Sequence, residues 1–101
     1  MSFTKVGQVG DVPPGTAREY EIGGRSIAVC NVDGELFAFD ALCTHAEGIL
    51  YEGELEGHEI ECPRHGARFD VRTGEAKPAP ADVTVDTFGV RIEGADIEID
   101  V

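Results

Sequence analysis

Hydrophobic and polar residues alternate in short runs along the chain, and glycine or proline separates most runs from the next. The last run, residues 97–101, alternates aliphatic with acidic residues, which is typical of a strand with one buried and one solvated face. The pairs Gly23-Gly24 and Asp33-Gly34 are favoured in two-residue hairpin turns. Because we find no repeat and no long helical pattern, we predict an all-β fold. The predicted strands cover residues 3–9, 18–22, 26–32, 35–40, 54–55, 59–61, 83–86, 88–93 and 97–101.

The segment from residue 41 to residue 76 differs in character from the rest of the chain. Its predicted strands are short, and it holds two pairs that each combine a cysteine with a histidine. We therefore predict a single domain, 1–101, in which residues 1–40 and 77–101 form an antiparallel β base and residues 41–76 form an inserted subdomain.

Length and composition agree with a small soluble domain. A chain of 101 residues, 42% of them hydrophobic, can bury about two-thirds of its unfolded surface around one modest core. No apolar run approaches the roughly 20 residues of a membrane span, and the N-terminus lacks the apolar core of a signal peptide. The net charge of −12 argues against nucleic acid binding, because phosphates would repel the chain.

Two cysteine–histidine pairs, C-x-H and C-x-x-H, carry the distinctive chemistry of the chain. Cys43 and His45 form the first pair, and Cys62 and His65 form the second. Thiolates and imidazoles bind soft or borderline metals, so these four residues suggest one metal site closed by two loops. Chance, a structural zinc site and a [2Fe–2S] cluster compete as interpretations. Zinc sites usually group like ligands, whereas one cysteine and one histidine on each loop suit a cluster with two cysteines on one iron and two histidines on the other.

The two pairs, as C-T-H at 43–45 and C-P-R-H-G at 62–66, resemble the Rieske iron–sulfur proteins. The resemblance is strong over residues 38–80, and elsewhere it rests on length and strand pattern. It implies the Rieske fold, an antiparallel β-sandwich base with 41–76 as the cluster-binding subdomain. Further matches are Phe69-Asp70, the turn Thr73-Gly74, and Pro78-Ala79-Pro80, which is similar to the proline loop that covers the cluster in this family.

By this resemblance the protein holds one [2Fe–2S] cluster. Cys43 and Cys62 would bind the inner iron, and His45 and His65 would bind the outer iron, close to solvent and to a docked partner. Four ligands saturate both irons, and no acid–base constellation accompanies them. We therefore expect an electron carrier rather than an enzyme.

The sequence also indicates which kind of Rieske protein this is. High-potential members join their two cluster loops by a disulfide, and the matching positions here are Gly48 and Arg64. Those members also place a Ser and a Tyr hydroxyl against the cluster sulfurs, where this chain has Ala67 and Phe69. Hydrogen bonds to sulfur stabilise the extra electron, so their loss predicts a reduction potential near the roughly −150 mV end of the Rieske range.

A soluble, single-domain, low-potential Rieske protein is similar to the ferredoxins of bacterial aromatic-ring dioxygenase systems. Such a carrier takes electrons from an NAD(P)H-dependent flavoprotein reductase and passes them to a terminal Rieske non-haem iron oxygenase. We expect transient docking at the end that carries His45 and His65, with Arg64 touching the partner and acidic charge steering it. Alternatives are the small subunit of an assimilatory nitrite reductase and a housekeeping Rieske ferredoxin. We expect a monomer.

The residues outside the motif have plainer interpretations. If Cys43 and Cys62 hold metal, Cys30 has no disulfide partner within the chain, which favours the reducing cytoplasm. Cys30 itself is expected to be a small buried hydrophobe, and His58 a solvated residue at a strand end. The basic residues from the second motif to residue 77 either form local ion pairs or, in the case of Arg64, meet a partner. They are Arg64, Arg68, Arg72 and Lys77.

Overall fold

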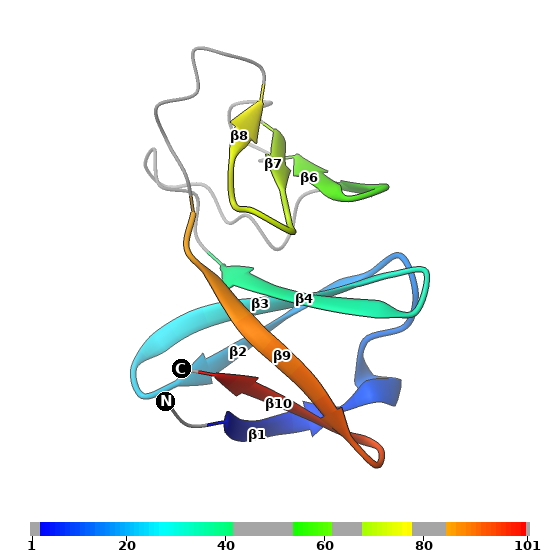
Figure 1. Ribbon diagram of the computed structural model, residues 1–101, viewed down its shortest axis with the longest axis vertical. Helices are drawn as coiled ribbons and strands as arrows, with labels where there is room; N and C mark the ends of the chain where they lie inside the picture. Colours follow the sequence, from blue (N-terminus) through cyan, green and yellow to red (C-terminus); the bar gives the residue numbers. More distant parts are fainter. Residues whose placement is uncertain (1–2, 42–53, 62–67, 78–84, 101) are drawn as a thin grey trace.

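Two antiparallel sheets make up the computed structural model, which describes residues 3–41, 54–61, 68–77 and 85–100 (Figure 1). The base is a six-stranded sheet in the order β1-β10-β9-β4-β3-β2, and the small sheet has the order β5-β6-β7-β8. The strands are β1 (Phe3–Gln8), β2 (Ala17–Ile22), β3 (Arg25–Val32), β4 (Glu35–Asp40), β5 (Glu54–Glu56), β6 (Glu59–Glu61), β7 (Arg68–Asp70), β8 (Ala76–Lys77), β9 (Thr87–Glu93) and β10 (Asp96–Asp100).

Tight hairpins connect the central strands of the base, as predicted. Asp33 and Gly34 link β3 to β4 with φ angles of 53° and 96°, the left-handed values that a two-residue hairpin needs at both positions. The Asn31 side chain supports this turn by accepting a hydrogen bond from the Gly34 amide at 2.7 Å. The local turn chemistry therefore sets the register of β3 and β4.

The six-stranded base folds over on itself and encloses one hydrophobic core. Strand β9 pairs with β10 from Gly89 to Glu93 but with β4 only through Thr87 and Phe88, so the sheet bends at this point. Ile27 from β3 packs on one side of the core and Ile97 from β10 on the other, and both are fully buried. The predicted all-β sandwich-like base is thus confirmed.

A second core joins the base to the small sheet. Strand β3 alternates, so that Cys30 faces this second core while Ile27 faces the first. Phe39 from β4 meets Ile60 and Phe69 from the small sheet here, all three with no exposed surface. Because both faces of β3 are covered, its middle, from Ile27 to Cys30, is a continuous apolar run in the sequence.

The structure differs from the predicted elements at three places. β1 ends at Gln8, because residues Val9–Asp11 form a 3₁₀ turn (η1) in which the Asp11 carboxylate accepts the Gln8 amide at 3.0 Å. The strand predicted over 83–86 is wrong for Val85 and Asp86, whose hydrogen bonds go to two different elements instead of one neighbouring strand. The sequence pattern does not predict strands β7 and β8, since each is too short to show an alternating pattern.

Candidate metal centre

The four predicted ligands fall in two ranges, 42–53 and 62–67, that lie outside the described residues, and the predicted proline loop falls in a third, 78–84. The structure does describe the residues at which these ranges join the two sheets. The ligands concerned are Cys43, His45, Cys62 and His65.

One end of the small sheet carries the attachment points of all three ranges. Glu54 pairs with Glu61, Glu61 pairs with Arg68, and Arg68 pairs with Lys77, so these four residues form one row across the sheet. Each residue of the row directly borders a range outside the described part of the chain. The two cysteine–histidine pairs are therefore tethered to neighbouring strands at the same sheet end, as a metal site shared by two loops requires.

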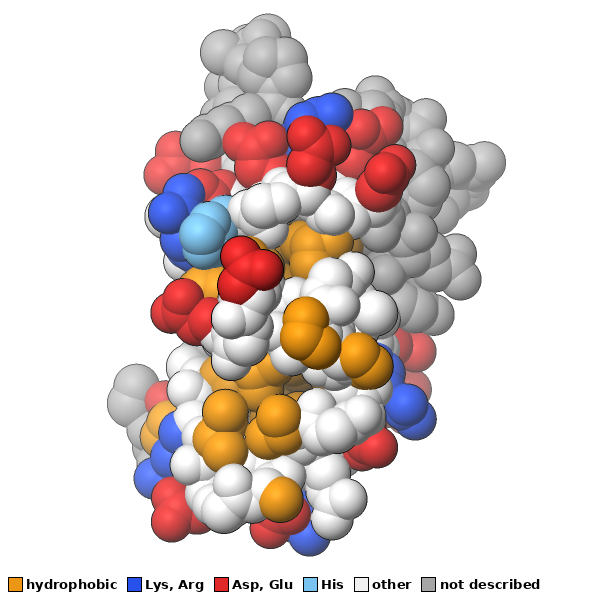
Figure 2. Space-filling view, turned by 90° about the vertical axis from the view of Figure 1, so that its right-hand side faces the viewer, with side chains coloured by type: hydrophobic (Ala, Val, Ile, Leu, Met, Phe, Trp, Pro, Cys, Tyr) orange, Lys and Arg blue, Asp and Glu red, His pale blue; other side chains and the backbone are white. Residues whose placement is uncertain are grey.

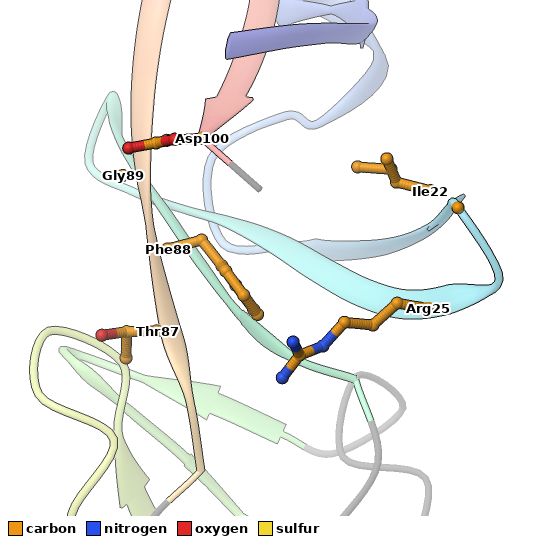
Figure 3. Close-up of a pocket in the computed structure, with 7 residues that line it drawn as sticks. Ile22, Arg25, Thr87, Phe88, Gly89 and Asp100 are labelled. Carbon is orange, nitrogen blue, oxygen red and sulfur yellow. The ribbon is translucent and has the colours of Figure 1, made fainter. Parts of the chain in front are cut away.

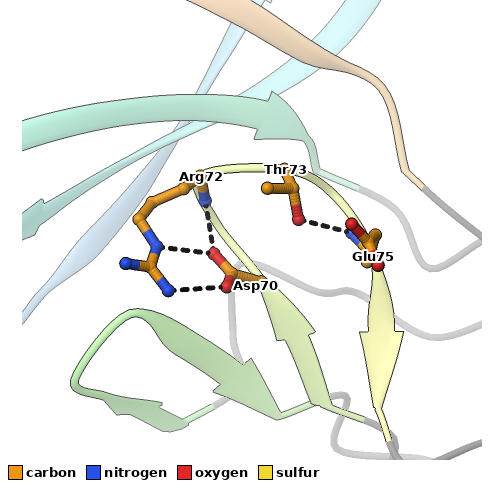
Figure 4. Close-up of polar contacts among 4 residues, drawn as sticks. All are labelled: Asp70, Arg72, Thr73 and Glu75. Atoms are coloured by element: carbon orange, nitrogen blue, oxygen red, sulfur yellow. Dashed lines mark hydrogen bonds and ion pairs between the residues drawn. The ribbon is translucent and has the colours of Figure 1, made fainter.

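The turn between β7 and β8 is held by a buried carboxylate (Figure 4). Asp70 accepts hydrogen bonds from the Arg72 backbone amide at 2.9 Å and from the Arg72 guanidinium at 3.1 and 2.9 Å. The hydrogen bond to Asp70 raises the pKa of Arg72, so the guanidinium stays charged. Glu75 donates its backbone amide to the Thr73 hydroxyl at 3.3 Å. These contacts fix the turn through which β7 leads into β8.

Gly74 lets this turn approach the base closely. Its φ angle is +82°, its amide donates to the Asp70 carbonyl at 2.7 Å, and its own carbonyl accepts from the Val85 amide at 2.8 Å. A Cβ at Gly74 would lie 2.0 Å from the Val85 carbonyl oxygen. The predicted turn at Thr73-Gly74 is confirmed, but its contact with Val85 could not be read from the sequence.

Acidic side chains gather over the small sheet (Figure 2), around the guanidinium of Arg68. Arg68 lies 4.0 Å from Glu56, 3.8 Å from Glu59 and 3.5 Å from Glu61. Arg68 and Arg72 thus form the local ion pairs expected for basic residues in this region, whereas Arg64 lies outside the described residues.

The cysteine outside the two motif pairs, Cys30, has a packing role. Cys30 is fully buried in the core between the sheets, and burial raises the pKa of its thiol to about 12. A buried, protonated thiol is a poor metal ligand, because metals bind the thiolate. Its predicted role as a small buried hydrophobe is confirmed.

The histidine outside the two motif pairs, His58, is less exposed than predicted. His58 is half-buried and packs edge-on against Phe37, with ring centroids 5.7 Å apart, so the prediction of a solvated residue is wrong. His58 lies in the β5–β6 turn, and its carbonyl accepts a hydrogen bond from the Val71 amide at 2.8 Å. With Cys30 and His58 engaged in packing, the remaining two cysteines and two histidines are the ones in the predicted motif.

Within the described ranges, no cluster of three or more His, Cys, Asp or Glu side chains is arranged to hold a metal ion. A helix of the length and apolarity needed to cross a membrane is also absent from those ranges.

Comparison with known proteins defines the family. The Rieske [2Fe-2S] domain model matches residues 2–89, and the chain therefore belongs to the Rieske family. Its cofactor is one Rieske [2Fe–2S] cluster, as the sequence predicted, and a donor set of two thiolates and two imidazoles fits that cluster.

The chain is similar over nearly its full length to ferredoxins of oxygenase systems. The ferredoxin component of biphenyl 2,3-dioxygenase from Rhodococcus jostii (strain RHA1) is 47% identical, with 99% of this chain and 94% of the relative covered. The Sphingomonas yanoikuyae B1 ferredoxin superimposes with a TM-score of 0.90 at 39% identity, covering 99% of each chain. A chain in the complex of reduced oxygenase and oxidized ferredoxin in carbazole 1,9a-dioxygenase has a TM-score of 0.87 at 35% identity, covering 96% and 91%.

One further structure bears on the alternative of a nitrite reductase small subunit. A protein of the nitrite reductase small-subunit type has a TM-score of 0.86 but only 15% identity, with all of both chains covered. At that identity the likeness shows a shared fold and nothing more.

Proposed function

We propose that this protein carries single electrons from an NAD(P)H-dependent flavoprotein reductase to a terminal Rieske non-haem iron oxygenase that acts on an aromatic ring. The observation that carries this proposal is 47% identity, over nearly the whole of both chains, to a dioxygenase ferredoxin component. The protein would work in the cytoplasm as a monomeric carrier, with the oxygenase as the catalyst.

The cluster supplies one-electron chemistry, and the chain supplies its ligands and its surroundings. Cys43 and Cys62 would hold the inner iron as thiolates, and His45 and His65 would each hold the outer iron through one ring nitrogen. Attachment of both pairs to one end of the small sheet supports this assignment. We further propose that 41–76 acts as the cluster-binding subdomain on a base formed by the rest of the chain, except that Lys77, predicted to belong to the base, lies in β8 of the small sheet.

Reconstituted turnover tests the proposal. The purified protein is mixed with the reductase and oxygenase of a biphenyl dioxygenase system, and NADH oxidation and dihydroxylated product are measured together. We expect product formation that depends on the holoprotein, with apoprotein as the control. If the reductase reduces the protein but no oxygenase accepts the electron, the partner assignment fails; if neither step occurs, the carrier role fails.

The reduction potential is predicted to be low. Phe69 takes the place of the tyrosine of high-potential members, is fully buried, and has no hydroxyl to donate to a cluster sulfur. Voltammetry should give a potential near roughly −150 mV. Phe69→Tyr should raise the potential, whereas the matched change Phe69→Leu, which adds no hydroxyl, should not. A wild-type value above zero would reject this account of the site.

Arg64 is predicted to contact the partner beside His65. Arg64→Glu should slow electron transfer to the oxygenase roughly three- to tenfold at low ionic strength, and salt should reduce the difference. Arg18→Glu makes the same charge change on an exposed residue of β2 and serves as the control. Equal rates for the two variants in stopped-flow reduction would exclude a docking role for Arg64.

A further inference from the structure

The chain passes between the base and the small sheet twice, and the two passages lie side by side. It leaves the base through Asp40 and Ala41 at the end of β4, and it returns through Val85 and Asp86 before β9 begins. The Asp40 amide donates to the Asp86 carbonyl at 2.9 Å. We call this pair of passages, residues 40–41 and 85–86, the neck.

The guanidinium of Arg25 contacts one acidic side chain from each passage. The Arg25 guanidinium, at the start of β3, lies 2.6 Å from the Asp86 carboxylate and 3.5 Å from the Asp40 carboxylate. It also lies over the Phe88 ring, 4.8 Å from the ring centroid, in an open cleft of about 660 Å³ (Figure 3). The hydrogen bond to Asp86 raises the pKa of Arg25, so the cation persists over the whole physiological pH range.

We propose that Arg25 is a positioning residue for the iron–sulfur cluster: it fastens the neck and thereby restrains the chain that leads to Cys43. The proposal rests on the proposed function, because it takes Cys43 as a ligand. Without Arg25, the carboxylates of Asp40 and Asp86 would lose the cation that both of them contact. The neck would then open more often, and the cluster would be exposed to solvent and chelators more often.

The chain contains a matched control for this arginine. Arg91 also makes an ion pair of 2.6 Å, with Glu98, and also lies over a phenylalanine ring, that of Phe3, at 4.2 Å. The two arginine side chains are similarly exposed, 46% for Arg25 and 52% for Arg91. Arg91 connects the adjacent strands β9 and β10 and does not touch the neck. Arg25→Gln and Arg91→Gln therefore remove similar contacts at different places.

The experiment measures loss of the cluster's visible absorbance in excess chelator, together with the reduction potential. Arg25→Gln should lose its cluster roughly two- to fivefold faster than Arg91→Gln, with Arg25→Lys in between because it keeps the charge but not the forked geometry. Its potential should fall below that of Arg91→Gln, because a positive charge near the neck favours the added electron. Thermal unfolding of the two apoproteins should be similar.

Salt gives a second measurement, made on the wild type and on Arg25→Gln. Because the ion pairs are exposed, cluster loss from the wild type should accelerate in about 1 M salt, where the screening length is about 3 Å, while Arg25→Gln should respond less. The proposal would be overturned if the two glutamine variants had equal rates of cluster loss and equal potentials. It would also be overturned if the rate of cluster loss from the wild type did not change with salt. A wild-type protein without iron and sulfide would instead overturn the proposed function.

Discussion

Replacing Gly74 with alanine should lower the thermal unfolding midpoint by roughly 15 °C or more, whereas Gly24→Ala should lower it by only about 5 °C. Both glycines have nearly the same left-handed backbone, with φ angles of +82° and +81°, so both variants incur a strain of about 1 kcal/mol. Only at Gly74 does the new Cβ meet another group, the Val85 carbonyl oxygen at 2.0 Å.

The additional loss of stability in Gly74→Ala arises because the new Cβ displaces the backbone of Val85. The Val85 amide donates a hydrogen bond to the Gly74 carbonyl. The Val85 carbonyl therefore cannot move away without breaking that hydrogen bond and shifting Val85, which is buried. We expect about 2–3 kcal/mol beyond the backbone strain. Calorimetry of the two variants beside the wild type measures the difference. Similar midpoints for the two variants would show that the β7–β8 turn can move away from Val85 at little cost.

Cys43→Ser and Cys62→Ser should each abolish the [2Fe–2S] cluster, whereas Cys30→Ala should retain it. A serine hydroxyl does not replace a thiolate as a ligand for this cluster, so iron and acid-labile sulfide should fall to background in the first two variants. Cys30 is buried in the core between the sheets with a thiol pKa raised to about 12, and it contributes packing only.

The Cys30 variant is the internal control for this test. Removing one buried sulfur should cost about 1 kcal/mol of stability, which leaves the fold and the absorbance spectrum intact. Loss of the cluster from Cys30→Ala with a native circular dichroism spectrum would place a ligand where we find none. Retention of a full cluster in Cys43→Ser would equally contradict the ligand assignment.

Most of the base could be predicted because its signals are local. The Asp33-Gly34 pair specifies a hairpin whatever the rest of the chain does, and it fixes the register of the two strands beside it. Strands β7 and β8, by contrast, are too short to show a period and are held by the turn from Asp70 to Gly74. Their existence depends on packing that the sequence does not display.

The candidate ligands could be predicted for a chemical reason. Cysteine and histidine are scarce in this chain, and four of the six fall into two short motifs, which few structural roles would produce. The roles of Arg25 and Gly74 could not be predicted, because each depends on a tertiary contact. Arg25 meets Asp86 across 61 positions of sequence, and Gly74 meets the Val85 backbone. The half-buried position of His58 also follows from a tertiary contact, the Phe37 ring.

The ligand set of the cluster is the central claim, and pulsed electron paramagnetic resonance of the reduced protein tests it most directly. Protein grown with nitrogen-15 histidine should show couplings from two histidine nitrogens on the reduced cluster, unchanged in His58→Gln and altered in His45 and His65 variants. A cluster with no coupled histidine nitrogen, or a colourless protein that contains zinc, would contradict the account.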